Sequence, residues 1–277
     1  MKFVDIKNDL AFRKIFGNEN TKEVLISFLN AILTLANDKK IVEIELLNTY
    51  QLPELLSDKV TIIDVKARDQ NNSSYIVEMQ VAKVDELNKR VLYYASQSYT
   101  SQIDRGDLYE KLSPVFFIGI LDFSATTNPH YIRRHKILDV ATHENYISDI
   151  EFNFIELPKF TKAENELETI IDQWVYFIKN AEDLRIIPEN VKVQGLKIAY
   201  EKADKHNWTK LELEEYNKIF IKEQDERGKV TYAVRTAKEE QLNQVAVNFL
   251  NLGISIEDTA KGTGLTIEQV VNLKGGL

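Results

Sequence analysis

The chain has no cysteine among its 277 residues, so disulfide bonds and thiolate metal sites are excluded. Histidine is also scarce. The four histidines are scattered, and none forms the HxxxH pair that holds zinc on a helix: His130, His135, His143 and His206. Any metal bound here is therefore expected to be a hard divalent cation with oxygen ligands.

Long apolar runs are missing as well. None approaches the roughly 20 residues that a membrane-spanning helix needs. The mixed, charged segment 1–9 lacks the pattern of a secretion signal. We therefore expect a cytoplasmic protein with no membrane partner.

Positive charge is in deficit too, with a net charge of −8 and a pI of about 5.2. This balance argues against a protein that coats nucleic acid through bulk charge. It still leaves room for a nuclease, because local patches can supply the contacts to nucleic acid and a metal site is itself acidic.

What remains is an ordinary globular composition, with 44% hydrophobic and 28% charged residues. Apolar periodicity predicts a helix between Asn8 and Gly17, a second helix from Asn20 with Glu23 completing a capping box, and a long helix over 85–106. Strands are expected over 41–47, 60–67, 75–81, 115–121, 135–140 and 150–157. The polar stretch after the second strand joins it to the third as a β-hairpin.

From Thr161 onward every apolar pattern has helical period, and Thr161 with Glu164 is expected to cap the first helix. We therefore assign 1–160 to an α/β core and 161–277 to a helical C-terminal appendage that ends in a small helix-turn-helix-like segment. The appendage has an apolar stripe that must be buried against the core or against a second copy of the chain. This stripe includes Leu167, Ile171, Trp174 and Ile178.

The residues with the clearest chemistry are Asp64, Glu78 and Gln80. Side chains alternate between the faces of a strand, so Glu78 and Gln80 share a face. If the hairpin is symmetric about Asn71, Asp64 lies opposite Glu78, with Cβ atoms roughly 4.5–5.5 Å apart. Two carboxylates that close repel each other unless a cation lies between them. Mg²⁺ suits this position, because it binds one or two carboxylates together with waters and phosphate oxygens.

A divalent cation there would supply what phosphodiester hydrolysis requires, because it activates water and neutralises charge on phosphate oxygens. Gln80 is placed to hold the attacking water through its amide, but it cannot act as a general base. The simpler alternative is a chance pattern of Asp in one strand and Glu-x-Gln in the next. Charges embedded in otherwise apolar strands favour the functional interpretation.

Several blocks of sequence, taken in order, resemble the PD-(D/E)xK nuclease family transposases, also called recombination-promoting (Rpn-type) nucleases. The central block is 64–69 (Asp-Val-Lys-Ala-Arg-Asp) followed by 76–80 (Ile-Val-Glu-Met-Gln). Further similar segments are 9–17, 152–160 and the tail at 253–257 and 263–266, with single positions Arg90, Tyr93, Tyr94, Gln102, Gly106 and Tyr109. The resemblance is good over residues 3–160 and weak over 161–244, and it rests on the ordered set of motifs.

This resemblance implies a restriction-endonuclease-like mixed sheet flanked by helices. It also implies endonucleolytic cleavage of DNA that depends on Mg²⁺, with Mn²⁺ as a substitute. According to the resemblance, the metal ligands are the side chains of Asp64 and Glu78 and the backbone carbonyl of Met79. The usual lysine of the superfamily is replaced by Gln80, which removes a phosphate-stabilising cation. Lys66, two residues beyond Asp64, is the expected substitute.

Three positions on predicted helices are secondary candidates, each with a structural alternative. Asp9 is either an extra acidic residue near the metal or a helix cap. Lys14, beside Arg13, is either an accessory phosphate contact or part of a solvated helix face. Arg90 either lines a DNA cleft or belongs to a packing stripe.

The densest basic run contains Arg133, Arg134 and Lys136, and we expect it to bind nucleic-acid phosphates. Its structural alternative is a solvated run of charges.

Two functions from different classes stay open. The first is a Mg²⁺-dependent DNA endonuclease of a mobile-element type, for which two copies would cut the two strands of a duplex. The second is a degenerate nuclease fold that binds nucleic acid or protein without cutting, which the acidic pI and the missing lysine favour.

Overall fold

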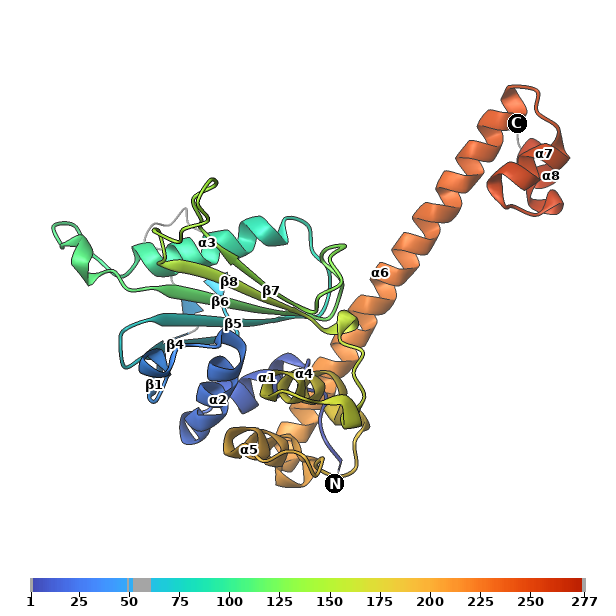
Figure 1. The fold of residues 1–277 in the computed structure, drawn as a ribbon. Helices are drawn as coiled ribbons and strands as arrows, with labels where there is room; N and C mark the ends of the chain where they lie inside the picture. Colours follow the sequence, from blue (N-terminus) through green and yellow to red (C-terminus); the bar gives the residue numbers. More distant parts are fainter. Residues whose placement is uncertain (1, 49, 52–60, 276–277) are drawn as a thin grey trace. The chain divides into compact units, whose positions relative to one another are not determined.

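The computed structural model of the protein describes residues 2–48, 50–51 and 61–275. At its centre is a six-stranded mixed sheet with strand order β1-β4-β5-β6-β8-β7 and helices on both faces (Figure 1). Its strands are β1 (Ile44–Leu46), β4 (Val65–Asp69), β5 (Ser74–Gln80), β6 (Val115–Leu121), β7 (Ile132–Lys136) and β8 (Ile150–Glu156). A separate ribbon pairs β2 (Tyr50–Gln51) with β3 (Thr61–Ile62). The predicted α/β fold with a restriction-endonuclease-like mixed sheet is confirmed.

Strands β5, β6 and β8 run parallel, whereas β1, β4 and β7 each run antiparallel to a neighbour. The parallel register aligns Gln80 with Leu121 and Leu121 with Glu156. The carboxyl ends of three central strands therefore lie at one edge of the sheet, where side chains from distant parts of the sequence can meet.

The hairpin of β4 and β5 has the predicted register. Val65 pairs with Val77, and one further step along the same register would set Asp64 opposite Glu78, as symmetry about Asn71 predicts. The chain departs from the ladder at that step, because β4 begins only at Val65. The predicted strand over 60–67 is thus interrupted just where its acidic residue lies; Val60 itself lies outside the described residues.

A tight turn fixes this register. The Asp69 Oδ1 atom accepts hydrogen bonds from the backbone N–H groups of Asn71 at 2.9 Å and Ser73 at 2.8 Å. The Tyr75 hydroxyl donates to Asp69 Oδ2 at 2.9 Å. Asn72 has a φ of 64°, a left-handed conformation that asparagine tolerates better than most residues. The carboxylate thus ties the two strands together at their turn.

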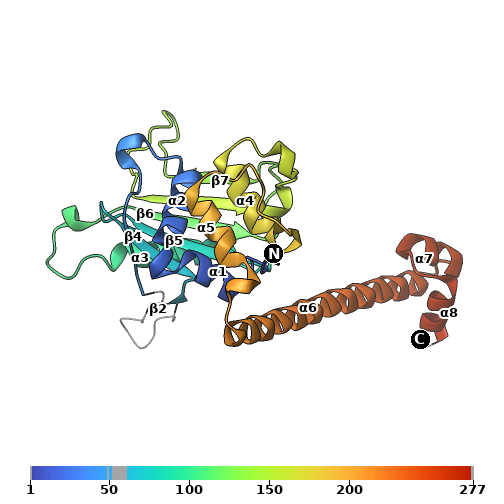
Figure 2. The ribbon, with the colours of Figure 1, turned by 90° about the horizontal axis from the view of Figure 1, so that it is seen from below.

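Four helices cover one face of the sheet, where Figure 2 shows them lying across the strands. They are α1 (Asp9–Phe16), α2 (Lys22–Leu33), α4 (Ile170–Asn180) and α5 (Gln194–Ala203). Helix α1 begins and ends as predicted, with the Asn8 side chain accepting from two backbone N–H groups and the Gly17 N–H donating to the Arg13 carbonyl at 2.8 Å. The opposite face is covered by α3 (Leu87–Thr100), which packs Val91 and Ala95 on the sheet.

The apolar stripe of the C-terminal region is buried within the fold. Trp174 is fully buried, and its ring lies 5.9 Å from that of Phe16 and 5.5 Å from that of Phe28, measured between centroids. Phe177 packs on Tyr200 of α5 with centroids 4.6 Å apart. The core is therefore the partner of this stripe, and a second copy of the chain is not needed to cover it.

Several boundaries differ from the predictions. Helix α2 begins at Lys22 after a 3-10 turn, and Thr21 caps it without a side-chain hydrogen bond, so the predicted Asn20–Glu23 capping box is wrong. Helix α3 is shorter than 85–106: it begins at Leu87, after Glu86 in a left-handed conformation, and it ends at Thr100 with Ser101 as its C-cap. Short 3-10 turns occur at Glu19–Thr21, Asn37–Lys39, Tyr109–Lys111, Leu157–Lys159, Glu164–Glu166, Ala181–Asp183 and Lys205–Asn207.

Two further differences lie later in the chain. The strand predicted over 135–140 is β7 at 132–136, since the following residues form an exposed loop. The capping box before α4 consists of Thr169 and Asp172 instead of Thr161 and Glu164. In both cases the predicted feature exists, but it occurs at a different position in the sequence.

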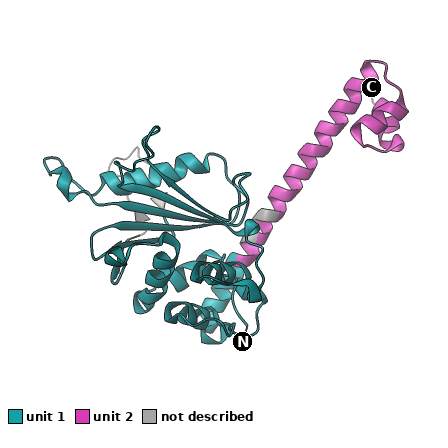
Figure 3. Ribbon diagram, in the orientation of Figure 1, with its two compact units in different colours: residues 1–219 teal, residues 220–277 magenta. Residues whose placement is uncertain are grey.

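The chain divides into two compact units, residues 1–219 and 220–277 (Figure 3). This boundary differs from the predicted division at 160, because α4 and α5 pack into the core of unit 1. Helix α6 (Lys210–Asn251) passes from one unit into the other. Unit 2 ends with α7 (Ile256–Thr263) and α8 (Ile267–Gly275), joined through Gly264 at a φ of 75°. These two helices form the predicted helix-turn-helix-like segment.

Within residues 2–48, 50–51 and 61–275, no helix combines the length and hydrophobicity that crossing a membrane requires.

A chain ended after Phe160 should fail to fold, whereas one ended after Ile219 should keep unit 1. The shorter chain loses Trp174, Phe177 and Tyr200, all buried. Removing one large buried aromatic side chain costs about 3–5 kcal/mol, and a domain has only about 5–15 kcal/mol of stability. Thermal unfolding followed by circular dichroism checks both chains. Cooperative unfolding of the 1–160 chain would contradict this assignment of α4 and α5 to the core.

Candidate functional site

Asp64 lies in the break between β3 and β4, and it is 8% exposed. Its Oδ2 atom accepts a hydrogen bond from the backbone N–H of Met79 at 3.0 Å. Its Oδ1 atom accepts two hydrogen bonds from Arg13 of α1, at 3.0 Å from Nη2 and 3.2 Å from Nε. The carboxylate is therefore held from two sides, by the neighbouring strand and by a guanidinium group.

Glu78, on β5, is the neighbour of Asp64. Its Oε1 atom is buried and has no hydrogen-bond partner within the described residues. Burial raises the pKa of Glu78 to about 8, and the negative charge of Asp64 adds to this effect, while the positive charge of Arg90 opposes it. An acceptor oxygen left without a donor beside a second carboxylate is an arrangement that a cation would satisfy.

Arg90 reaches this site from α3. Its Nη2 atom donates a hydrogen bond to Oε1 of Gln80, and the Gln80 amide nitrogen donates to the Ala82 carbonyl at 3.0 Å. The guanidinium also lies over the ring of Tyr94, 5.8 Å from its centroid. Arg90 was expected either to line a DNA cleft or to belong to a packing stripe. In the structure it packs on Tyr94 and contacts Gln80, beside the acidic site.

A small pocket adjoins these groups between β5, β6, β8 and α3. Its polar members are Glu78, Gln80 and Arg90, and the rest is mainly apolar: Leu87, Val91, Tyr94, Phe117, Gly119, Leu121 and Phe154. Gly119 is aligned with Glu78 across the parallel pair, and a Cβ atom there would lie 3.0 Å from the Phe154 ring. The apolar lining explains why the Glu78 carboxyl is poorly solvated.

Helix α1 brings further charge to the site. The pKa of Asp9 is raised by desolvation of its carboxyl and then by the negative charge of Asp64, with Arg13 opposing both effects. Asp9 therefore lies within electrostatic reach of the acidic pair. The cap of the helix is Asn8, whose side chain accepts from the Leu10 and Ala11 N–H groups.

Lys14 is turned away from the acidic pair. It forms an ion pair with Glu212 of α6, and its Nζ lies 4.3 Å from the centroid of the Trp208 ring. The cation of α1 that contacts the site is its neighbour Arg13, which the sequence offered, like Lys14, as either a phosphate contact or part of a solvated helix face. A signal for it was present: Arg13 lies four residues after Asp9, so both share one side of the helix.

Lys66, the expected substitute for the missing lysine, forms no ion pair with Asp64 or Glu78 in the part of the chain that the structure describes. Its pKa is lowered by burial and by the like charge of Arg68. The cation beside Glu78 is that of Arg90 instead.

The residues present fit a divalent cation with few protein ligands. The described residues contain no group of three or more His, Cys, Asp or Glu side chains arranged to hold a metal. The pair Asp64 and Glu78 is, however, sufficient for Mg²⁺, which commonly takes one or two carboxylates and keeps several waters. The orphaned Glu78 oxygen is the observation that supports this fit. For Met79, the structure gives a hydrogen bond from its N–H to Asp64, which places its backbone beside the pair.

The basic run on β7 does not form one patch. Arg133 and Arg134 are neighbours on an edge strand, so their side chains leave opposite faces. Arg133 lies over the Phe154 ring, which packs toward α3, whereas Arg134 donates to the carbonyl of Ile32 in α2 at 2.5 Å. Lys136 pairs with Glu151 at 3.0 Å. The expected joint phosphate-binding surface of Arg133, Arg134 and Lys136 is therefore not found.

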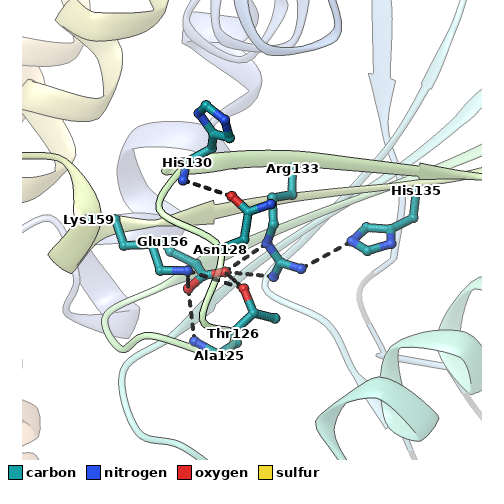
Figure 4. Close-up of polar contacts among 8 residues, drawn as sticks. All are labelled: Ala125, Thr126, Asn128, His130, Arg133, His135, Glu156 and Lys159. Atoms are coloured by element: carbon teal, nitrogen blue, oxygen red, sulfur yellow. Dashed lines mark hydrogen bonds and ion pairs between the residues drawn. The ribbon is translucent and has the colours of Figure 1, made fainter.

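Arg133 instead belongs to a network around Glu156 (Figure 4). Glu156 is fully buried and accepts from Arg133 at 2.7 Å, from Lys159 at 2.6 Å and from the Ala125 N–H at 2.9 Å. Burial disfavours its charge, but the hydrogen bonds from Lys159 and Ala125 and the charge of Arg133 outweigh that effect and lower the pKa of Glu156. The network ties the loop after β6 to the same sheet edge as Gln80.

A family model described as PD-(D/E)XK nuclease family transposase matches residues 6–233. No curated protein and no solved structure matches the chain significantly.

Glu156→Ala is expected to lower the free energy of unfolding by roughly 3–5 kcal/mol, because it leaves the buried charges of Arg133 and Lys159 without a partner. Lys136→Ala is the control: its ion pair with Glu151 is 45% exposed on the lysine side, so its loss should cost at most about 1 kcal/mol. Denaturant unfolding measures both. Equal effects of the two substitutions would contradict the structural role of the Glu156 network.

The metal-free protein should lose stability as pH rises from about 4.5 to about 8, and Glu78→Gln should lose less. In this range the folded chain retains the Glu78 proton that the unfolded chain has released. The folded state therefore binds more protons, and stability falls with pH by at most about 1.4 kcal/mol per pH unit from this group. Unfolding in chelator across this range measures the slope, with the exposed Glu110→Gln as control. A wild-type slope in Glu78→Gln, equal to that of the control, would refute the burial of the Glu78 proton.

Proposed function

Because this chain belongs to the PD-(D/E)XK nuclease family transposases, we propose that it is a divalent-metal-dependent endonuclease that hydrolyses phosphodiester bonds in DNA. The observation that supports this best is the pair of adjacent carboxylates, with one buried Glu78 oxygen lacking a donor. No group among the described residues donates a hydrogen bond to that oxygen, whereas a hard cation would bind it.

Asp64 and Glu78 would hold the cation, which is Mg²⁺ with Mn²⁺ as a substitute. A bound divalent cation supplies activated water and neutralises charge on the phosphate. The Met79 N–H, 3.0 Å from Asp64 Oδ2, fixes the orientation of this carboxylate. Gln80 lies next along the strand face and would orient a water through its amide, with no proton to give or take at neutral pH.

Arg90 would take the role of the missing lysine. It lies against Gln80 and lowers the pKa of Glu78 against the effect of burial, so its charge is felt at the carboxylate pair. Guanidinium groups bind phosphate oxygens in bidentate geometry and stay charged at all working pH values. Arg90 on α3 would thus provide the phosphate-stabilising positive charge that Gln80 on β5 lacks.

The substrate we propose is duplex DNA, with each site cutting one strand. Double-strand cleavage would then take two copies of the chain, one per strand. The alternative is a degenerate site that binds nucleic acid without cutting it. Gln80 in the lysine position is the observation that favours this alternative.

Purified protein should nick supercoiled plasmid in Mg²⁺, and Asp64→Asn or Glu78→Gln should reduce the rate by at least about 100-fold, equivalent to about 2.7 kcal/mol of barrier. Lys14→Met is the matched control, since it removes a charge from the same helix as Arg13 but away from the carboxylates. Plasmid binding without nicking, equal in wild type and Asp64→Asn, would support the degenerate-site alternative and refute the endonuclease.

Arg90→Met should lower the nicking rate by on the order of 100-fold while Mn²⁺ affinity is retained, since it removes a charge-stabilising group and no ligand. Adding Gln80→Lys to this variant moves the cation from α3 back to β5. The double variant is expected to regain part of the lost activity. Unchanged nicking by Arg90→Met would show that Arg90 does not serve the phosphate.

A further inference from the structure

Arg13 contacts an oxygen of Asp64, one of the two proposed metal ligands. Both Nη2 and Nε of Arg13 donate to Oδ1 of Asp64, at 3.0 and 3.2 Å, while Oδ2 is taken by the Met79 N–H. Neither oxygen of this carboxylate is left without a donor. Because Arg13 is a cation and it sits on a proposed metal ligand, it competes with the metal for the same negative charge.

Arg13 is free to leave this position. Its side chain is 45% exposed, whereas that of Asp64 is 8% exposed. The helix that carries it is anchored independently through Phe12, Ile15 and Phe16, all buried. The guanidinium can therefore turn into solvent without moving α1, while Asp64 stays fixed by the backbone of β5.

We propose that Arg13 takes the place of the divalent cation at Asp64 in the metal-free protein, and that, once displaced by the cation, it binds a phosphate of the DNA beside the site. This inference rests on the proposed function, because it presumes a metal at Asp64 and Glu78. It makes Arg13 an occupant of the site in one state and a substrate contact in the other.

The second role follows from reach and from chemistry. Because Arg13 contacts Asp64 directly, a phosphate bound beside the proposed metal would lie near its guanidinium, and guanidinium groups bind phosphate in bidentate geometry. The neighbouring cation Lys14 cannot share this task, because it is paired with Glu212 and lies over Trp208. The free protein thereby keeps a positive charge at its acidic centre until metal and DNA replace the internal partner.

The first test measures the affinity of the full-length protein for Mn²⁺ by isothermal titration calorimetry, without DNA. Arg13→Met should bind Mn²⁺ about tenfold more tightly than wild type, because one charge-assisted contact no longer has to be broken. Lys14→Met should bind like wild type. Arg13→Lys, which keeps the charge but not the two-pronged contact, should fall between and provides a second variant if the methionine variant folds poorly.

The second test measures binding of an unspecific duplex oligonucleotide, with Ca²⁺ or with chelator, under conditions where the duplex stays intact. With Ca²⁺, Arg13→Met should weaken binding and reduce the slope of log affinity against log salt by about one. In chelator the same substitution should have no effect, because Arg13 is then held by Asp64. Lys14→Met should show no such dependence on the metal.

The outcomes separate this inference from the proposed function. If wild type binds Mn²⁺ and Arg13→Met binds it equally or more weakly, the competition is refuted and the metal site stands. If the Ca²⁺ arm shows no difference between Arg13→Met and wild type, the phosphate contact is refuted. If no folded variant binds Mn²⁺, the proposed metal site fails, and the inference fails with it.

Discussion

The adjacency of two carboxylates at the end of a buried hairpin is the constraint on which the rest of the site depends. Asp64 and Glu78 lie close together because Asp64 directly precedes β4, whose Val65 pairs with Val77, and its Oδ2 atom accepts from the Met79 N–H. Like charges at that distance, beside an apolar pocket, must be compensated by a cation, a proton or backbone donors. The structure uses all three: Arg13 and the Met79 N–H at Asp64, and a raised pKa at Glu78, which Arg90 partly offsets. Helices α1 and α3 lie on opposite faces of the sheet. Arg13 of α1 contacts Asp64, and Arg90 of α3 lies near Glu78.

How far sequence reasoning reaches is visible in these same residues. The hairpin could be predicted, register included, because side-chain alternation and a turn at Asn71 are local properties of the chain. The identity of the compensating cations could not, since Arg13 is 51 residues from Asp64 in sequence, and only the packing of α1 decides that it, and not Lys14, turns to the site. The run at 133–136 lies in a strand, so alternation sends Arg133 and Arg134 to opposite faces, and a count of basic residues alone could not show this. The compact units divide near 219 and not at 160, a difference that helical period could not indicate because it says nothing of what a helix packs against.

The chain is acidic overall, so the positive charge that the proposed binding of DNA requires must come from particular side chains. Several basic side chains are paired within the protein: Arg133 and Lys159 with Glu156, Lys14 with Glu212, and Lys162 with Asp172. Buried pairs such as the first hold elements together and are not available to a ligand without unfolding them. The pair of Arg13 and Asp64 combines a 45% exposed cation with an 8% exposed carboxylate, and the Lys162–Asp172 pair is similar, at 35% and 1%. Of these two pairs, only that of Arg13 includes a carboxylate that lies beside Glu78.

Stability and chemistry are consequently coupled at this site. The apolar pocket beside Glu78 keeps its carboxyl poorly solvated, so at neutral pH the metal-free fold must retain a proton there or accept an uncompensated charge. A ligand that binds only the folded chain adds stability in proportion to its concentration relative to its dissociation constant. A divalent cation would remove the strain between the carboxylates and would also release Arg13 toward solvent. Metal binding at Asp64 and Glu78 would then have two effects. It would raise the stability of the fold, and it would free the positive charge of Arg13 at the edge where the DNA backbone would lie.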